Sequence, residues 1–191
     1  MNHLEIEFKT GLSQESYSSL LAEFREAEQL DQVNYYFDTA DQCMKKAKMA
    51  LRIRTEGDRR ELTLKIPQAV GNMEYNQDLT EEEMVLFLNK GVFPAGQVQD
   101  ILLEKRLAVA ELVLLGTLEN HRLEMETSIG LMALDQSRYF GITDYELELE
   151  VIDPILGQKN FQDFLAARGI PYQEVASKIA RFAQARKNTE I

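Results

Sequence analysis

Short segments in which hydrophobic and polar residues alternate strictly recur along the chain. In the segment from Tyr145 to Val151, the residues Glu146, Glu148 and Glu150 share one side, while the tyrosine, two leucines and the valine share the other. Alternation with a period of two is typical of β-strands that have one apolar and one polar face. The pattern predicts strands over residues 3–9, 33–38, 48–55, 61–66, 73–79, 122–126 and 145–151, with 130–134 as a candidate eighth.

Between these segments the hydrophobic residues recur at helical spacing. Over residues 13–30 the apolar side chains fall on one face, and Ser13 can cap the first turn. Thr80 and Glu83 form the Thr-x-x-Glu pattern of a capping box, which predicts a helix that begins there and ends near Gly91. Further helices are predicted after Pro94, over 161–165 and over 175–183.

The polar positions of the predicted strands are mostly charged. Glu146, Glu148 and Glu150 lie about 7 Å apart in succession on one strand face and repel one another. A divalent cation removes this repulsion, because Mg²⁺ and Mn²⁺ bind carboxylate oxygens. Glu5 and Glu7 repeat the same spacing near the start of the chain. The sequence therefore predicts Mg²⁺ or Mn²⁺ as a cofactor.

Basic residues occupy the same kind of position on two other strands. Arg52, Arg54 and Lys65 alternate with apolar neighbours, and guanidinium and ammonium groups recognise phosphate oxygens. Acids for a metal together with bases for phosphate indicate a metal-bound polyphosphate ligand. The alternation also fits an ordinary antiparallel sheet with one solvated face, so the pattern alone leaves both interpretations open.

For these charges to act together, the sheet must curl until its charged faces converge. Its apolar faces then lie outside, where amphipathic helices cover them. The predicted fold class is therefore α+β: an eight-stranded antiparallel β-barrel with a charged interior, covered outside by helices. A length of 191 residues without a Pro/Gly/Ser-rich linker favours one domain over residues 1–191.

Composition narrows the partners and the compartment. A net charge of −11 disfavours nucleic-acid polymers and anionic membrane surfaces, whereas a small anionic ligand can still bind where cations cluster. Cys43 is the one cysteine, so an internal disulfide is excluded, and the sequence has neither a secretory signal nor an apolar run of membrane length. We expect a cytoplasmic protein that does not bind membranes, and the oligomeric state, a homodimer included, stays open.

An ordered series of motifs extends over nearly the whole chain. It begins with Glu5-Ile6-Glu7-Phe8-Lys9, Tyr36-Phe37-Asp38-Thr39, Leu51-Arg52-Ile53-Arg54, Leu62-Thr63-Leu64-Lys65 and Glu74, and continues with Arg122, Leu134-Asp135, Glu146 to Glu150 and Ser177-Lys178. The series resembles the CYTH superfamily, the triphosphate tunnel metalloenzymes, which includes inorganic triphosphatases, thiamine triphosphatase and class IV adenylyl cyclases. One departure is Asn120, because similar bacterial members tend to have a threonine two residues before the arginine.

The resemblance implies an eight-stranded tunnel that binds a triphosphate with one or two divalent cations. It implies that the catalytic metal ligands are Glu5, Glu7, Glu148 and Glu150, with Glu146 as a further ligand. It also implies that phosphate oxygens are held by Lys9, Arg52, Arg54, Lys65, Arg122 and Lys178. Glu74 and Asp135 resemble the family's additional acids, which orient basic side chains or complete the metal shell, and both roles stay open.

Three functions are consistent with this chemistry. The first is metal-dependent hydrolysis of inorganic triphosphate or a simple organic triphosphate, because no aromatic clamp for an organic group is visible. The second is a class IV-type adenylyl cyclase, in which the ribose 3′-hydroxyl attacks the α-phosphorus and pyrophosphate leaves. The third is a non-catalytic module that binds polyphosphate or a nucleotide.

Overall fold

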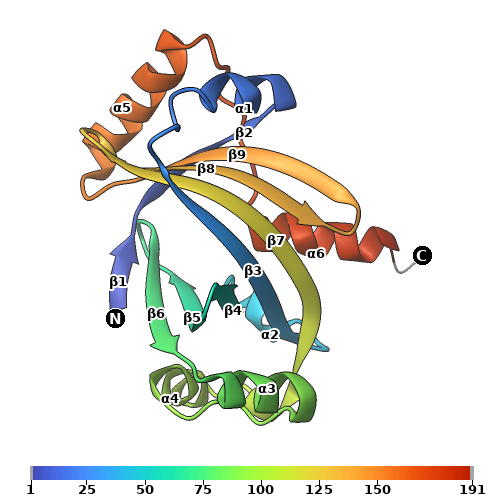
Figure 1. Ribbon diagram of the computed structural model, residues 1–191. Helices are drawn as coiled ribbons and strands as arrows, with labels where there is room; N and C mark the ends of the chain where they lie inside the picture. The colour runs from blue at the N-terminus through green and yellow to red at the C-terminus, as the bar shows by residue number, and fades with distance from the viewer. Residues whose placement is uncertain (1, 190–191) are drawn as a thin grey trace. The chain divides into compact units, whose positions relative to one another are not determined.

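The computed structural model describes residues 2–189, which form an α+β structure of antiparallel strands and helices. These described residues contain nine strands and six α-helices (Figure 1). The strands are β1 (Asn2–Glu5), β2 (Glu7–Leu12), β3 (Glu28–Thr39), β4 (Ala50–Glu56), β5 (Arg59–Pro67), β6 (Asn72–Asp78), β7 (Leu112–Thr127), β8 (Gly130–Tyr139) and β9 (Ile142–Glu150). The helices are α1 (Gln14–Leu20), α2 (Cys43–Lys46), α3 (Glu81–Lys90), α4 (Gln97–Glu104), α5 (Pro154–Ala167) and α6 (Lys178–Thr189).

The chain groups into two compact units. Among the described residues, the first unit comprises residues 2–4 and 32–118, and the second unit comprises residues 5–31 and 119–189. Strands β3 and β7 each contribute residues to both units. The prediction of one domain over residues 1–191 stays a prediction.

In the first unit the strands lie in the order β1-β6-β5-β4-β3, and β3, β4, β5 and β6 pair antiparallel. One face carries the alternating apolar residues of β4 and β5, among them Leu51 and Leu64, which are fully buried. They belong to the same core as Phe87 of α3 and Leu102 of α4, and full burial of such a side chain stabilises the fold by about 1.5–3 kcal/mol. The charged residues of β4 and β5 therefore occupy the opposite face.

In the second unit the strands lie in the order β7-β8-β9-β2, again antiparallel. Leu134, Leu147 and Leu149 are fully buried on one face, in a core with Leu20 of α1 and Phe161 of α5. Helix α6 lies on the other face, where its first turn contacts charged side chains of β8 and β9 (Figure 1). The alternation in the sequence thus separates an apolar face from a charged face in this unit as well.

All eight predicted strands are present, and the α+β class is confirmed. The count becomes nine because the strand predicted over residues 3–9 is divided at Ile6. β1 pairs with β6, whereas β2 pairs with β9, and the carbonyl of Ile6 accepts a hydrogen bond from the backbone of Val151 at 2.9 Å. The alternation continues unbroken through Ile6, so the sequence carries no sign of this break. Closure of the strands into a barrel stays a prediction.

The helix predicted over residues 13–30 is wrong in length. Ser13 caps it as predicted, because its hydroxyl accepts from the backbone nitrogen of Ser16 at 3.1 Å, but α1 ends at Leu20. Residues 28–30 already belong to β3, where the side chain of Asp31 bonds His121 of β7 at 2.7 Å. Contacts with a neighbouring strand thus override the helical spacing at the end of the predicted segment.

The remaining predicted helices are confirmed as α3, α4, α5 and α6. The capping box of α3 is complete, with Thr80 and Glu83 bonded in both directions, and Gly91 ends the helix in the left-handed conformation with φ 66°. Helix α2 is a single turn that the sequence pattern does not predict. Among the residues that the structure describes, no helix is both long and apolar enough to cross a membrane.

Candidate active site

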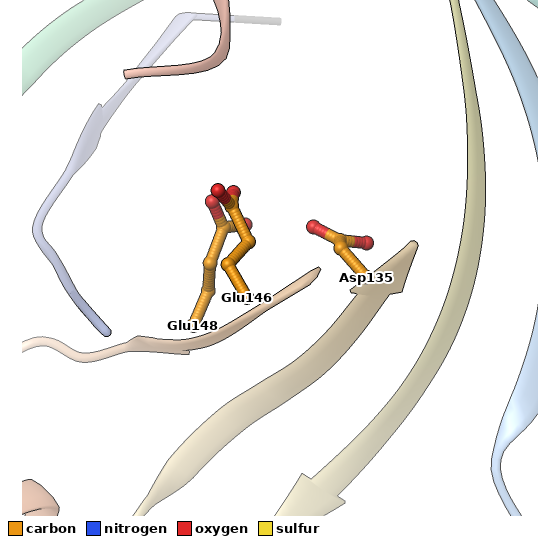
Figure 2. Close-up of side chains that lie close together, drawn as sticks. All are labelled: Asp135, Glu146 and Glu148. Carbon is orange, nitrogen blue, oxygen red and sulfur yellow. The ribbon is translucent and has the colours of Figure 1, made fainter. Parts of the chain in front are cut away.

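Three carboxylates converge on the charged face of the second unit. Asp135 of β8 is directly opposite Glu146 of β9, and Glu148 follows two residues later on the same face. One oxygen from each lies within 4.8 Å of the others, and all three residues are buried (Figure 2). We call this group the acidic triad. Carboxylates this close repel strongly in a buried place, so they need cations.

The cations are supplied by two neighbouring elements. Lys178, the first residue of α6, places its Nζ 2.7 Å from Asp135 and 3.0 Å from Glu148, and it also donates to Glu146. Arg122 of β7 forms a two-pronged pair with Asp135, Nε to Oδ1 at 2.8 Å and Nη2 to Oδ2 at 2.7 Å, and also donates to Glu148. The ammonium group of Lys178 therefore bonds every member of the acidic triad.

These pairs set the protonation of the acids. Burial alone raises the pKa of Asp135, but the charges of Arg122 and Lys178 outweigh it and lower that pKa to about 2. The pKa of Glu148 is likewise well below its usual value, because the same two cations and Lys9 overcome the effect of burial. Burial, opposed by Lys178 and reinforced by Glu148, raises the pKa of Glu146 to about 7. Within the acidic triad, Asp135 and Glu148 thus stay ionised across the neutral pH range.

Strand β2 adds the predicted residues of the first motif to the same unit. Lys9 is opposite Glu148 of β9, with its Nζ 3.6 Å from that carboxylate, and it also bonds Glu7. Glu7 is itself directly opposite Glu150. Such neighbours have Cβ atoms about 5 Å apart, so two carboxylates there are destabilising without a cation. Glu5 is the last residue of β1 and is half-buried.

The donor chemistry of these residues fits a hard divalent cation. Glu5, Glu7, Glu148 and Glu150 offer carboxylate oxygens, which are the ligands that Mg²⁺ and Mn²⁺ prefer. Glu7, Glu148 and Glu150 lie along the pairing of β2 with β9. The acidic triad, by contrast, already surrounds the ammonium group of Lys178.

The first unit carries the other predicted phosphate ligands on its charged face. Lys65 of β5 is opposite Glu74 of β6 and forms an ion pair with it. Although burial opposes it, the charges of Lys65 and Arg52 lower the pKa of Glu74 to about 2. Arg54 donates through its Nε to the side-chain oxygen of Asn34 at 3.0 Å. Glu74 is thus paired with a basic side chain, and the two roles that the sequence leaves open for it stay predictions.

Arg52 lies between polar neighbours on this face. It is opposite Tyr36 of β3 and Thr63 of β5. Within the described part of the chain, the Nε of Arg52, the hydroxyl of Thr63 and the side-chain nitrogen of Asn34 are buried without a hydrogen-bond partner. Buried polar atoms normally have one, so this face retains donors that an anionic ligand can use.

Sequence reasoning missed Arg181. This residue donates to Asp144 through its Nε at 3.0 Å and also to Glu146. It lies one helical turn after Lys178 on α6, so the two side chains share a helix face. The i, i+3 spacing of two basic residues is the signal that could have identified it.

The described strands carry acids and bases on one face and pack the other face against helices, an arrangement whose bases can pair with anions and whose acids can pair with cations. The family comparison makes this specific. Residues 3–183 match the CYTH domain model, so the chain belongs to the CYTH family.

Three relatives show how far the likeness extends. The chain is 36% identical over 188 residues, 97% of each chain, to the Bacillus subtilis protein named "Putative triphosphatase YjbK". A crystal structure of a "putative adenylate cyclase" from Bacillus halodurans is 36% identical, with a TM-score of 0.90 and coverage of 95% of this chain and 98% of that one. HpAC1 from Hippeastrum, described as a "putative adenylyl cyclase" with a dominant triphosphatase activity, is 27% identical, with a TM-score of 0.76 and coverage of 95% and 96%.

Proposed function

We propose that this chain is a divalent-metal-dependent triphosphatase that hydrolyses inorganic triphosphate or a simple organic triphosphate. The observation that carries the proposal is the acidic triad with Lys178 and Arg122 bonded to it, since these acids and bases are buried and held within reach of one another. Bases of this kind hold phosphate oxygens, and Glu148, together with Glu7 and Glu150 along the β2–β9 pairing, offers the carboxylates that hold a metal ion. Triphosphatase activity is named for two of the relatives, which supports the same reaction class.

The predicted phosphate ligands and metal ligands keep their roles in this proposal. Phosphate oxygens are held by Lys9, Arg52, Arg54, Lys65, Arg122 and Lys178. The metal is held by Glu5, Glu7, Glu148 and Glu150, with Glu146 as a further ligand. Mg²⁺ or Mn²⁺, when bound, neutralises phosphate charge and makes water a better nucleophile.

Binding a triphosphate requires the basic side chains to exchange partners. Lys9, Arg122 and Lys178 are bonded to carboxylates in the structure. A phosphate chain carries several negative charges and takes over these donors, which releases oxygens of Glu148. The same cations then stabilise the charge that develops on the phosphoryl group during in-line attack by water. No covalent nucleophile is needed.

A class IV-type adenylyl cyclase is the second candidate. It is supported by two structural relatives that are named as putative adenylate or adenylyl cyclases. Cyclisation uses the same binding groups but places the ribose 3′-hydroxyl, rather than water, in line with a phosphorus atom. The two reactions differ in their products, because hydrolysis of a terminal phosphate releases orthophosphate whereas cyclisation releases pyrophosphate and cyclic AMP.

Product analysis tests the proposal. Purified protein is incubated with tripolyphosphate, ATP or thiamine triphosphate, with and without Mg²⁺ or Mn²⁺, and orthophosphate, pyrophosphate and cyclic AMP are resolved. We expect metal-dependent orthophosphate, with tripolyphosphate among the best substrates. Pyrophosphate together with cyclic AMP would instead establish the cyclase, and tight binding of tripolyphosphate without any product would establish a binding module.

Variants connect the activity to this site. Glu148→Gln should abolish metal-dependent turnover, and Glu5→Gln should do the same without disturbing the partners of Lys178. Glu119→Gln is the matched control, because Glu119 is an exposed glutamate on strand β7. Full metal-dependent activity in folded Glu5→Gln would remove Glu5 from the metal site.

A further inference from the structure

The carboxylate of Asp135 accepts hydrogen bonds at both oxygens from three different side chains. Oδ1 accepts from Asn120 at 2.9 Å and from Nε of Arg122 at 2.8 Å. Oδ2 accepts from Nη2 of Arg122 and from Nζ of Lys178, both at 2.7 Å. A carboxylate has about four lone-pair positions, so these four donors use its capacity.

A second buried link lies behind Asn120. The hydroxyl of Ser137 donates to the side-chain oxygen of Asn120 at 2.8 Å, which directs the amide nitrogen of Asn120 toward Asp135. Asn120 is 2% exposed, and Ser137 and Asp135 are fully buried. If the amide were reversed, its oxygen would face the carboxylate, and two acceptors would meet in a buried place.

We propose that Asn120 and Ser137 are positioning residues that hold Asp135, and through it Arg122 and Lys178, in the orientation that receives phosphate, and that Asp135 is a partner of these cations rather than a metal ligand. This inference rests on the proposed function for the role of the two cations. It decides between the two roles that the sequence leaves open for Asp135.

The physical reason is the cost of releasing a donor. For Asp135 to bind a metal, one of its four bonds must break, which leaves a buried donor unsatisfied at a cost of about 1–3 kcal/mol. At Glu7 and Glu150, by contrast, a bound cation also relieves the repulsion between two carboxylates that lie directly opposite each other. The hydrogen bond from Asn120 also holds Oδ1 of Asp135 facing Arg122. The pair between Arg122 and Asp135 therefore stays aligned when Arg122 exchanges its bond to Glu148 for a bond to phosphate.

The first arm of the test measures metal affinity without substrate. Mn²⁺ binding to the full chain is followed by calorimetry for wild type, Asp135→Asn and Glu150→Gln. We expect Asp135→Asn to lose clearly less Mn²⁺ affinity than Glu150→Gln, because it removes a nearby negative charge but no bond to the ion, whereas Glu150→Gln removes a ligand oxygen. A loss in Asp135→Asn as large as that in Glu150→Gln would make Asp135 a metal ligand and overturn the inference.

The second arm measures positioning with variants that leave every cation in place. Asn120→Leu and Ser137→Ala should each raise KM for tripolyphosphate, about tenfold for Asn120→Leu, since a bond to a charged group is lost, while kcat changes less. Ser128→Ala, at an exposed serine between β7 and β8, is the control. An unchanged KM in both variants, or an equal loss of kcat and kcat/KM, would overturn the positioning role.

The two arms also separate this inference from the proposed function. If wild type releases no product, tripolyphosphate affinity measured by calorimetry replaces KM, and weaker binding by Asn120→Leu still supports the positioning role. Failure of wild type to bind tripolyphosphate would refute the proposed function and, with it, the phosphate-positioning role, while the Mn²⁺ measurement would still decide whether Asp135 is a metal ligand. If Asp135→Asn does not fold, Asn120→Leu takes its place in the Mn²⁺ measurement, because it frees one oxygen of Asp135 from a donor. Unchanged affinity is expected, and tighter Mn²⁺ binding would make Asp135 a metal ligand and overturn the inference.

Discussion

Replacing Lys178 by methionine removes the cation that bonds all three members of the acidic triad. Methionine keeps most of the length and apolar stem of lysine, so the change deletes a charge rather than a volume. The ammonium group is buried, with its side chain 10% exposed, and its pKa is raised because Asp135, Glu148 and Glu146 together outweigh the effect of burial. The charge of Lys178 is therefore fully present at every pH below the usual pKa of lysine, and the pairing weakens only at acidic pH, where the carboxylates of the acidic triad take up protons.

The size of the effect follows from what is left behind. Removing one partner of a buried ion pair typically costs about 3–5 kcal/mol, because the remaining charge is uncompensated. Arg122 still holds Asp135 and Glu148, which limits the loss, so we expect about 4 kcal/mol at pH 8. The acids of the variant should have folded pKa values above their unfolded values, so the loss should shrink as the pH falls toward 5 and they take up protons.

The assay is urea unfolding followed by circular dichroism at pH 8 and pH 5. Lys187→Met is the matched control, because Lys187 is an exposed lysine on the same helix, and it should cost less than about 1 kcal/mol. Lys178→Arg should retain more of the stability than Lys178→Met. The reasoning is refuted if Lys178→Met unfolds at the same urea concentration as Lys187→Met at pH 8, or if its deficit grows on acidification.

Three further predictions concern the first unit. Arg52→Ala should raise KM for tripolyphosphate about tenfold or more, because it removes charge-assisted bonds. Arg59→Ala, which changes an exposed arginine, should leave KM unchanged. Equal affinities of the two variants for tripolyphosphate, measured by calorimetry, would contradict this prediction. Glu74 has its pKa lowered to about 2, so wild type should lose about 3 kcal/mol from this group as the pH falls from 4.5 to 2. Glu74→Gln should be less stable than wild type at pH 7, and its free energy of unfolding, measured by urea titration, should change less between pH 4.5 and 2. If the variant lost as much stability as wild type over this pH range, the result would count against the ion pair of Glu74 with Lys65. Thr80→Ala should lower the free energy of unfolding by about 1 kcal/mol, because the capping box is lost. The expected readout is a Tm lower by about 2–4 °C, and an unchanged Tm would show that the cap does not stabilise the protein.

The strands could be predicted because their apolar faces are buried against helices, and burial of one face imposes a period of two. The break at Ile6 could not be predicted, since Leu4, Ile6 and Phe8 keep the period while β1 and β2 choose different partners. The end of α1 was also beyond the local pattern. Residues after Leu20 have the spacing of a helix, but pairing across space draws the following segment into β3.

The candidate site could be predicted in part for the same physical reason. Charged residues on strands stand out, because a strand face either meets water or needs a counter-charge. The pairing of each acid with a base depends on the register between strands that are distant in the sequence and on the position of α6. Local residue spacing predicts neither. Asn120 is visible in the sequence only as a departure from similar proteins, and its role depends on Asp135 and Ser137 being its neighbours across the β7–β8 pairing.

The one cation that bonds all three members of the acidic triad, Lys178, comes from far along the chain, which has a consequence for folding kinetics. Asp135 and Glu148 belong to adjacent strands of one hairpin, whereas Lys178 is 43 residues from Asp135, and the backbone of Gln173, just before α6, bonds Thr10 across 163 residues. Local hairpins form sooner than contacts that close long loops. The hairpin therefore assembles before Lys178 is in place, when Arg122 is the nearby cation and the carboxylates still repel one another. Moderate salt should speed this early stage of refolding by screening that repulsion.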